Sequence, residues 1–447
     1  MTSSSPRSAA PRPRLVDVRP DERTALVWAF VYFACLLGGY YILRPVREAL
    51  AVAGGVSNLP WLFTGTLVGM LAVTPVFGAV VARMPRRRFV PLVYRFFLLC
   101  ILGFAALLAL DVDRVVLAPA YFIWLSVYNL FVVSVFWSVM ADVFRSAQGK
   151  RLFGVIAAGG SLGALLGSWF TNAFATDLGV TALLCISALV LELAVRCFRA
   201  VTGNAPALAE DEGSTVDAGA DAATEASLRR AAEPPVIGGS VLAGATQVVR
   251  SPYLLGICLY LVCLSTASTF LYVERAEIVA TAFVSDEART AFFAMVDLLV
   301  NLGTILLQLL VTARVIGWLG VGATLAVLPV LSGVGFAGLA AWPTLAALVV
   351  FQAALRAGRY AIGRPARELL FTVVNREQKY KCKSFIDTVV YRAGDAVSSW
   401  VVRGLGALGL GLAGVALVAA PLAGLWLLVG LRLGREQEHR SQPRDRA

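Results

Sequence analysis

The sequence predicts an all-α polytopic membrane protein whose twelve transmembrane helices form two six-helix bundles. Of its 447 residues, 58% are hydrophobic and only 15% are charged, and the mean hydropathy is +0.76. This composition excludes a water-soluble enzyme and supplies enough apolar residues for about a dozen membrane spans. A polar segment near the middle of the chain divides the apolar runs six and six.

Twelve apolar runs are long enough to cross a bilayer, which takes about 20 residues of helix. In chain order they cover residues 25–50, 59–82, 89–110, 117–141, 152–175, 179–198, 253–276, 289–313, 317–341, 344–366, 384–408 and 411–431. The polar segment is rich in Ala, Gly, acidic and hydroxyl residues and cannot bury a core. We therefore expect a disordered N-terminus at 1–24, bundles at 25–199 and 252–432, a flexible linker at 200–251 and a tail at 433–447.

Basic residues fall on one side of this predicted topology. Besides both chain ends, they gather after the second, fourth and tenth runs, at Arg83, Arg86, Arg87, Arg88, Lys150, Arg151, Arg376, Lys379, Lys381 and Lys383. Because cytoplasmic loops are enriched in Lys and Arg, we expect both termini in the cytoplasm and the protein in the cell (inner) membrane. The net charge of +11 then reflects topology, so the expected partner is the lipid bilayer and not nucleic acid.

Two six-helix halves, each made of two inverted three-helix units, resemble the major facilitator superfamily. That resemblance implies a central cavity lined by the first, fourth, seventh and tenth helices. A repeated motif supports it, since residues 44–50 read RPVREAL and residues 364–370 read RPARELL, with five of seven positions identical. One copy ends the first span and the other follows the tenth, so we expect them at opposite membrane faces.

Charged residues gather on the expected cavity helices and on the eighth span. Asp142 and Arg145 follow the fourth span, Glu274 and Arg275 end the seventh, and Asp297 lies within the eighth. A charge near the bilayer centre costs at least about 2.5–3.5 kcal/mol, so it persists where water, a partner charge or a ligand compensates it. We assign these five residues to coupling or gating. Asp297 either pairs with an arginine or titrates during transport.

The tenth span carries the strongest signal for anion binding. Arg356, Arg359 or Tyr360, and Arg367 recur at three- and four-residue steps and are expected on one helical face. Guanidinium groups bind phosphate and carboxylate through paired hydrogen bonds. The alternative is that the outer arginines, Arg364 and Arg367, are positive-inside anchors.

Prolines and glycines mark special backbone positions in several spans. Pro45 and Pro365 either kink the first and tenth helices or end them. Glycines predict close helix packing in two places, at 159, 163 and 167 in the fifth span and at 404, 406, 409, 411 and 414 near the end of the eleventh.

Several kinds of catalytic chemistry have no residues to support them. His439, in the polar tail, is the one histidine of the sequence, and no G-x-x-x-x-G-K-[ST] loop occurs. P-loop ATP hydrolysis and Ser-His-Asp catalysis are therefore excluded. We expect no enzyme activity and no cofactor or metal.

Three short segments resemble the nucleotide transporter family of plastids and obligate intracellular bacteria, which exchanges ATP and ADP. They read Tyr41-x-x-Arg44-x-x-Arg47-Glu48-x-Leu50, Tyr360-x-x-x-x-Pro365-x-Arg367-Glu368 and Lys381-x-Lys383-x-x-x-Asp387-x-x-x-x-Arg392-x-Gly394. The resemblance implies phosphate-contacting roles for Arg47, Arg367, Lys381, Lys383 and Arg392.

The chain departs from that family's pattern at three places. Arginine replaces the family's lysine in the basic-acidic pair of both repeats, and Asp395 stands where the family usually has a lysine. Residues 396–397 also interrupt a run of small residues. Reversing a charge beside a phosphate site would weaken the binding of a triphosphate, so a smaller organic or phosphorylated anion is an alternative substrate.

The residue pattern leaves three functions open. We favour a monomeric secondary transporter of small anionic metabolites, with nucleotides as the leading candidate, working by alternating access. The expected substrate-binding residues are Arg44, Arg47, Glu48, Arg356, Arg359, Tyr360, Arg367, Glu368, Lys381, Lys383, Asp387 and Arg392. The alternatives are a proton-coupled major facilitator transporter for another small molecule, and a membrane scaffold or sensor that transports nothing.

Overall fold

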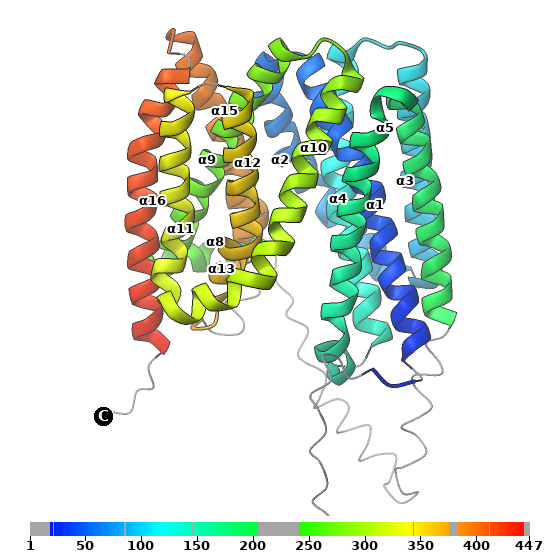
Figure 1. The fold of residues 1–447 in the computed structure, drawn as a ribbon. Helices are drawn as coiled ribbons and strands as arrows, with labels where there is room; N and C mark the ends of the chain where they lie inside the picture. Colours follow the sequence, from blue (N-terminus) through cyan, green and yellow to red (C-terminus); the bar gives the residue numbers. More distant parts are fainter. Residues whose placement is uncertain are drawn as a thin grey trace, which may run out of the picture.

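The structure is a computed structural model that describes residues 18–20, 22–84, 86–144, 146–203, 241–342, 344–374, 382–383, 385–410 and 412–441. This part of the chain is helical, without a β-strand. Its helices run roughly parallel and form two bundles that lie side by side (Figure 1). Large apolar side chains such as Leu99, Leu189 and Leu428 are more than half exposed on the outside, as expected for lipid-facing positions.

The first bundle contains five continuous helices that make six crossings. They are α1 (Arg23–Ala53), α2 (Leu59–Arg83), α3 (Arg86–Ala109), α4 (Arg114–Val143) and α5 (Ser146–Gly203), with a short 3₁₀ turn, η1 (Val56–Asn58), before α2. The helix α5 comprises two helices that meet at Gly179, where φ is 77° and ψ is 163°. This backbone conformation favours glycine, because it has no Cβ, and it lets the chain fold back.

The second bundle is built from shorter pieces. They are α8 (Val241–Arg250), α9 (Pro252–Ala282), α10 (Asp286–Leu307), η2 (Gln308–Thr312), α11 (Ala313–Ala341), α12 (Leu345–Gly358), η3 (Arg359–Gly363), α13 (Arg364–Leu370), η4 (Ile386–Val390), α15 (Tyr391–Ala407) and α16 (Leu412–Ser441). The segments η2, η3 and η4 are π-helical. They continue α10 into α11, join α12 to α13 and begin α15, so the tenth and eleventh predicted spans each contain a π turn.

The predicted twelve-span architecture is confirmed. Ten helices in the described residues are long and apolar enough to cross a membrane, and one of them, Arg151–Gly203, has 53 residues. Dividing that helix at Gly179 gives eleven crossings, and η4 with α15 adds the twelfth. The first described residues and the end of α16 lie at the same end of the molecule, as an even number of crossings requires (Figure 1).

The predicted linker and the predicted C-terminal tail are more helical than expected in the residues that the structure describes. The predicted linker 200–251 is helical up to Gly203 and again in α8, and residues 204–240 lie outside the described part. The expected tail 433–447 continues α16 as far as Ser441, where Arg440 pairs with Glu436 one turn earlier. An i, i+4 ion pair of this kind supports a helix beyond its apolar run.

One of the two predicted glycine seams is confirmed. A Cβ on Gly159, Gly163 or Gly167 of α5 would overlap a backbone carbonyl oxygen of α1, at Phe30, Ala34 and Gly38 respectively. These glycines therefore bring the two backbones into direct contact. The second expectation was wrong for the glycines at 404, 406 and 409, beside which no atom lies within 4 Å.

Both prolines of the repeated motif lie within continuing helices. Pro45 is inside α1, which runs on for eight more residues to Ala53, and Pro365 lies in the first turn of α13, directly after η3. The alternative that these prolines end their helices is therefore wrong. A proline ring clashes with the carbonyl group four residues earlier in an α-helix, and the wider π turn before Pro365 accommodates it.

The two bundles are joined at the end of the molecule opposite the described chain ends. Across the interface Arg114 pairs with Asp286 at 3.2 Å, and Arg403 donates a hydrogen bond of 2.8 Å to the carbonyl oxygen of Ser57. Trp400 donates to the hydroxyl of Thr64 at 3.1 Å. These three contacts close this end of the molecule.

Candidate functional site

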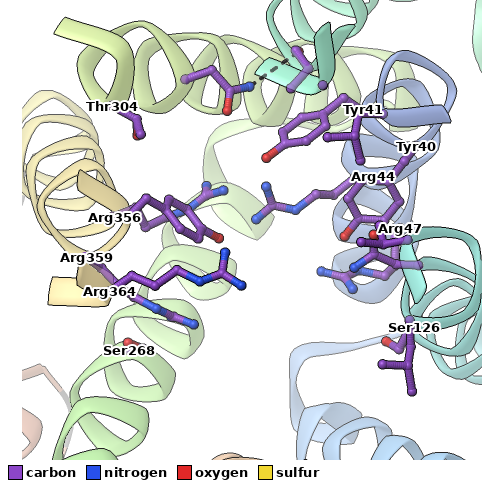
Figure 2. A pocket seen from close by; sticks show the side chains of 18 of the residues that line it. Tyr40, Tyr41, Arg44, Arg47, Ser126, Ser268, Thr304, Arg356, Arg359 and Arg364 are labelled. Atoms are coloured by element: carbon purple, nitrogen blue, oxygen red, sulfur yellow. Dashed lines mark hydrogen bonds between the residues drawn. The ribbon is translucent and has the colours of Figure 1, made fainter. Parts of the chain in front are cut away.

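A cavity of about 810 Å³ lies between the two bundles and is lined by residues of both. Among the residues that the structure describes, seven arginines line it, namely Arg44, Arg47, Arg275, Arg356, Arg359, Arg364 and Arg392, whereas two carboxylates do, Glu48 and Asp395. Figure 2 shows the arginines of α1 reaching into this space from one side and those of α12, η3 and α13 from the other. The sequence-based expectation that arginines from both halves converge therefore agrees with the structure.

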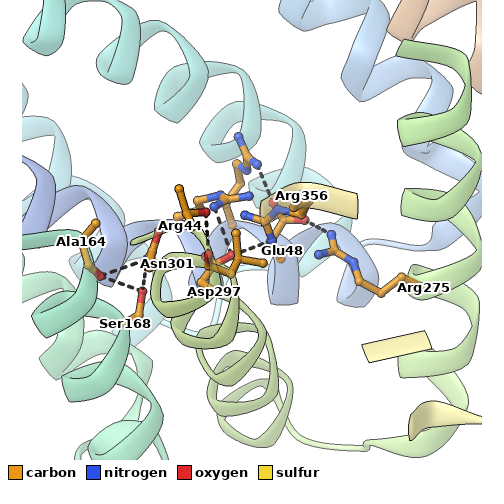
Figure 3. Close-up of polar contacts among 11 residues, drawn as sticks. Arg44, Glu48, Ala164, Ser168, Arg275, Asp297, Asn301 and Arg356 are labelled. Carbon is orange, nitrogen blue, oxygen red and sulfur yellow. Dashed lines mark hydrogen bonds and ion pairs between the residues drawn. The ribbon is translucent and has the colours of Figure 1, made fainter. Parts of the chain in front are cut away.

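Asp297 on α10 links two of these arginines. Its Oδ1 lies 3.1 Å from Nη1 of Arg44 and 2.8 Å from Nη1 of Arg356 (Figure 3). Asp297 is only 3% exposed, and it lies behind the cavity lining. Of the two predicted states, the structure therefore shows Asp297 paired. Because Arg44 belongs to the first bundle and Asp297 to the second, this pair also crosses the interface.

Glu48 links a second pair of arginines. It accepts a short hydrogen bond from its neighbour Arg47 and lies 2.6 Å from Nη2 of Arg275 on α9, again across the interface. Arg275 is also flanked by the rings of Tyr272 and Phe293, at 4.6 and 4.7 Å. Glu48 and Arg275 are 3% and 2% exposed. A buried charge is tolerated when it is paired in this way.

Asp395, on α15, is part of the cavity lining and is held in place by hydrogen bonds and an ion pair. Ser265 donates a 2.6 Å hydrogen bond to its Oδ1, Thr269 donates another at 3.3 Å, and Arg392 lies 3.6 Å from its Oδ2. The two hydroxyl donors come from α9, so the carboxylate is held by its own helix and by its neighbour. This aspartate, which departs from the nucleotide transporter pattern, therefore lies in the cavity wall.

Arg359 and Arg364 have a different environment from the other five arginines. Among the residues that the structure describes, neither forms an ion pair with a carboxylate. The guanidinium of Arg359 lies over the ring of Tyr391 at 5.0 Å and near that of Tyr360 at 5.7 Å. Arg364 is exposed to the cavity. Both side chains point into the open space between the bundles (Figure 2).

The π turn η3 decides which residues of the tenth span face the cavity. A regular α-helix would place Arg367 on the face of Arg356, as the sequence predicts. In a π turn the hydrogen bonds run from i to i+5, so the following residues are rotated relative to the α register. The structure accordingly places Arg364 in the lining, whereas Arg367 lies outside it and pairs with Asp387 at 3.2 Å.

The remaining predicted site residues lie elsewhere. Lys383 pairs with Glu368 at 2.6 Å and, like Arg367 and Asp387, is absent from the cavity lining. Asp142 is exposed on α4, and Glu274 is 3% exposed, and neither lines the cavity. Arg145 and Lys381 lie outside the described residues. Of the expected substrate-binding set, the cavity thus contains Arg44, Arg47, Glu48, Arg356, Arg359, Tyr360 and Arg392.

Arg364 is the main residue that the sequence reasoning left out of the site. The repeated motif includes Arg364, with a membrane-surface anchor as the alternative role, but the expected substrate-binding set omits it, although it occupies the same position in the second motif copy as Arg44 in the first. That equivalence was the signal that could have found it. Neutral polar side chains of the lining, among them Asn129, Gln308 and Gln352, carried no comparable signal.

The fixed charges of the cavity sum to a clear excess of cations. Counting the described residues alone, seven arginines face two lining carboxylates and Asp297 behind them, which gives a net charge of 7 − 3 = +4. In the described residues no group of three or more His, Cys, Asp or Glu side chains could hold a metal ion. The site is therefore suited to binding an anion directly through guanidinium groups.

Several solved structures of transporters have a similar architecture. No protein-family model and no curated protein sequence matches the chain. A bacterial homolog of the human lysosomal transporter Spinster, in an inward-facing and unoccupied conformation, matches with a TM-score of 0.58 at 12% identity, covering 96% of this chain and all of the other.

Peptide transporters of the POT family match in the same way. A mutant POT structure gives a TM-score of 0.59 at 15% identity over 94% of this chain and 99% of the other. A POT family transporter in complex with 5-aminolevulinic acid gives 0.58 at 9% identity over 93% and 96%. At such identities the likeness shows the fold alone and does not extend the resemblance to the nucleotide transporter family. The chain thus has the fold of the major facilitator-type secondary transporters.

Proposed function

We propose that this protein carries a multiply charged organic anion across the membrane by alternating access, with nucleotides as the leading candidate substrate. One observation carries the proposal: seven arginines from both bundles surround one cavity that holds a net charge of +4. Guanidinium groups in a poorly hydrated cavity attract anions more strongly than they would at a surface. The fold supports a transport role, and the resemblance of the motif segments to nucleotide transporters supports the choice of substrate.

The contacts between the bundles support the alternating-access mechanism. They close the end opposite the described chain ends, so the substrate would enter from the other end. If both termini are cytoplasmic, as the distribution of basic loops predicts, this conformation opens toward the cytoplasm of a cell whose inner membrane holds the protein. Reorientation would require the cross-bundle pairs of Arg44 and Glu48 to separate.

Exchange transport follows from the same charge balance. An empty cavity with uncompensated arginines is costly to carry through an occluded state, so a counter-substrate would have to enter before the protein returns. The test is uptake of labelled ATP into liposomes that contain the purified protein and are either empty or preloaded with ADP. We expect preloading to accelerate uptake. Equal uptake into empty vesicles would refute exchange, and uptake of carboxylates but no phosphorylated compound would refute the nucleotide assignment.

A proton-coupled transporter is the second candidate, and Glu274 is the observation that favours it. Its carboxylate is 3% exposed, and its Oε2 has no hydrogen-bond partner among the described residues. A buried acid without a matched partner is a candidate proton carrier. Transport that collapses with an uncoupler in the wild type but not in Glu274→Gln would support this candidate, and transport indifferent to the uncoupler would exclude it.

A further inference from the structure

We propose that Arg359 and Arg364 form the primary anion subsite of the cavity and that this subsite takes the dianionic terminal phosphate group of the substrate. The inference rests on the proposed anion transport and makes it more specific. It divides the seven arginines into five that already have a carboxylate and two that receive the ligand.

The ion pairs of the cavity separate these two groups. Asp297 forms ion pairs with Arg44 and Arg356, and Glu48 forms ion pairs with Arg47 and Arg275. Asp395 pairs with Arg392. Each shared carboxylate leaves one positive charge, and the pair with Asp395 leaves none. Arg359 and Arg364 contribute the other two positive charges of the +4 total. In the described residues they are the lining arginines without a carboxylate ion pair, so an incoming anion does not have to displace a paired carboxylate from them.

The π turn brings the two guanidinium groups onto one side of the helix. Arg359 is the first residue of η3 and Arg364 follows its last. The backbone N–H of Arg364 donates to the carbonyl oxygen of Arg359, which is an i to i+5 hydrogen bond. Residues five apart are therefore stacked along the axis, whereas an α-helix would turn them to different faces. Figure 2 shows the two side chains next to each other, directed into the cavity.

Aromatic rings hold Arg359 in position for a ligand. Tyr391 and Tyr360 approach its guanidinium at 5.0 and 5.7 Å. Contact with a ring uses the face of the guanidinium, whereas the N–H groups project from its edge toward an acceptor. Less side-chain entropy is then lost when the anion binds, because the group is already oriented.

The charge and geometry select the chemical class of the ligand. Two adjacent guanidinium groups present two forked sets of donors, and a phosphate monoester offers three oxygens and close to two negative charges at neutral pH. A single carboxylate would engage one fork and leave the second positive charge uncompensated. Inorganic phosphate and the terminal phosphate of a larger molecule share this chemistry, so separate probes must distinguish them.

The test is isothermal titration of the full-length protein in lipid nanodiscs at low salt. The probes are inorganic phosphate, glucose 6-phosphate, ATP and acetate. We expect the phosphorylated probes to bind more tightly than acetate, and ATP to exceed inorganic phosphate if a larger molecule is the source of the phosphate group. Arg359→Gln and Arg364→Gln should each raise the dissociation constant for phosphorylated probes about 10- to 100-fold, as expected for loss of charge-assisted hydrogen bonds.

Matched variants keep the outcome interpretable. Arg95→Gln, which removes an arginine outside the cavity, should leave binding unchanged. Arg364→Lys keeps the charge but loses the fork, so it should weaken binding less than Arg364→Gln, and it carries the test if the glutamine variant does not fold. If both glutamine variants bind as the wild type does while Arg44→Gln abolishes binding, the subsite is wrong but anion transport stands. If the wild type binds none of the anions, the proposed function itself fails.

Discussion

Replacing Asp297 by asparagine should weaken the contact that holds the two bundles together near the cavity. The substitution keeps the shape of the side chain but removes the carboxylate that Arg44 and Arg356 share at 3.1 and 2.8 Å. Both arginines would then carry an uncompensated charge. The variant can relieve this cost by letting Arg44 move into water, which requires the first bundle to move away from α10.

The size of the effect follows from the burial of the three side chains. Removing one partner of a buried ion pair costs about 3–5 kcal/mol. The side chain of Asp297 is 4% exposed, but those of Arg44 and Arg356 are each 13% exposed and border the cavity, so we use the lower value of about 3 kcal/mol. At 1.4 kcal/mol per factor of ten, the equilibrium should shift about 100-fold toward conformations in which the bundles separate.

Hydrogen exchange followed by mass spectrometry can measure this shift without labels. The loops 54–58 and 283–285 lie at the closed end, and their amides should exchange faster in Asp297→Asn than in the wild type. Glu192→Gln is the matched control, because Glu192 pairs with Arg95 inside the first bundle and spans no interface. Unchanged exchange in a folded Asp297→Asn variant would refute the view that this ion pair stabilises the closed end.

Three further predictions concern packing and charge. Gly163→Ala should lower the melting temperature, because the added methyl group would overlap the carbonyl oxygen of Ala34 and such overpacking costs about 1–3 kcal/mol. The control Gly154→Ala should leave the melting temperature unchanged, since no atom lies within 4 Å of the added methyl group. Glu48→Gln should destabilise the protein by about 3–5 kcal/mol, since it leaves Arg47 and Arg275 without their shared carboxylate. A melting temperature equal to that of the wild type would contradict this. Asp395→Asn should strengthen phosphate binding severalfold at low salt, by about 1 kcal/mol for one charge, and titrations at rising salt should remove the gain.

The fold could be predicted because the bilayer restricts the backbone so strongly. Inside lipid every backbone N–H and C=O group must be paired within the protein, so a run of about 20 apolar residues has few options besides a helix. The twelve apolar runs therefore located the spans. The helix α1 begins and ends within three residues of its run at 25–50, and α9 begins one residue before its run at 253–276 and ends six residues after it. What the runs could not show was local backbone detail, such as the fold-back at Gly179 and the π turns, because these depend on contacts with neighbouring helices.

The sequence predicted that arginines line the site, but not which carboxylates they pair with. The repeated motif pointed to arginines on the first and tenth spans, and Arg44 and Arg364 do occupy equivalent places in the cavity lining. The partners could not be deduced, because Glu48 and Arg275 are 227 residues apart and meet only across the interface. The expected role of Arg367 followed an α-helical period that η3 interrupts, and this shifted the cavity face by part of a turn.

The π turns have a mechanical consequence, because they are unevenly distributed between the bundles. Three occur in the second bundle, on the tenth and eleventh spans and after α10, and none occurs in the described residues of the first. A helix can exchange a π turn for α register by advancing one residue, with little net loss of hydrogen bonds. The second bundle can thus rewind locally and rotate the side chains that it presents. The described helices of the first bundle have no such turn, so we expect that bundle to move more nearly as a rigid unit.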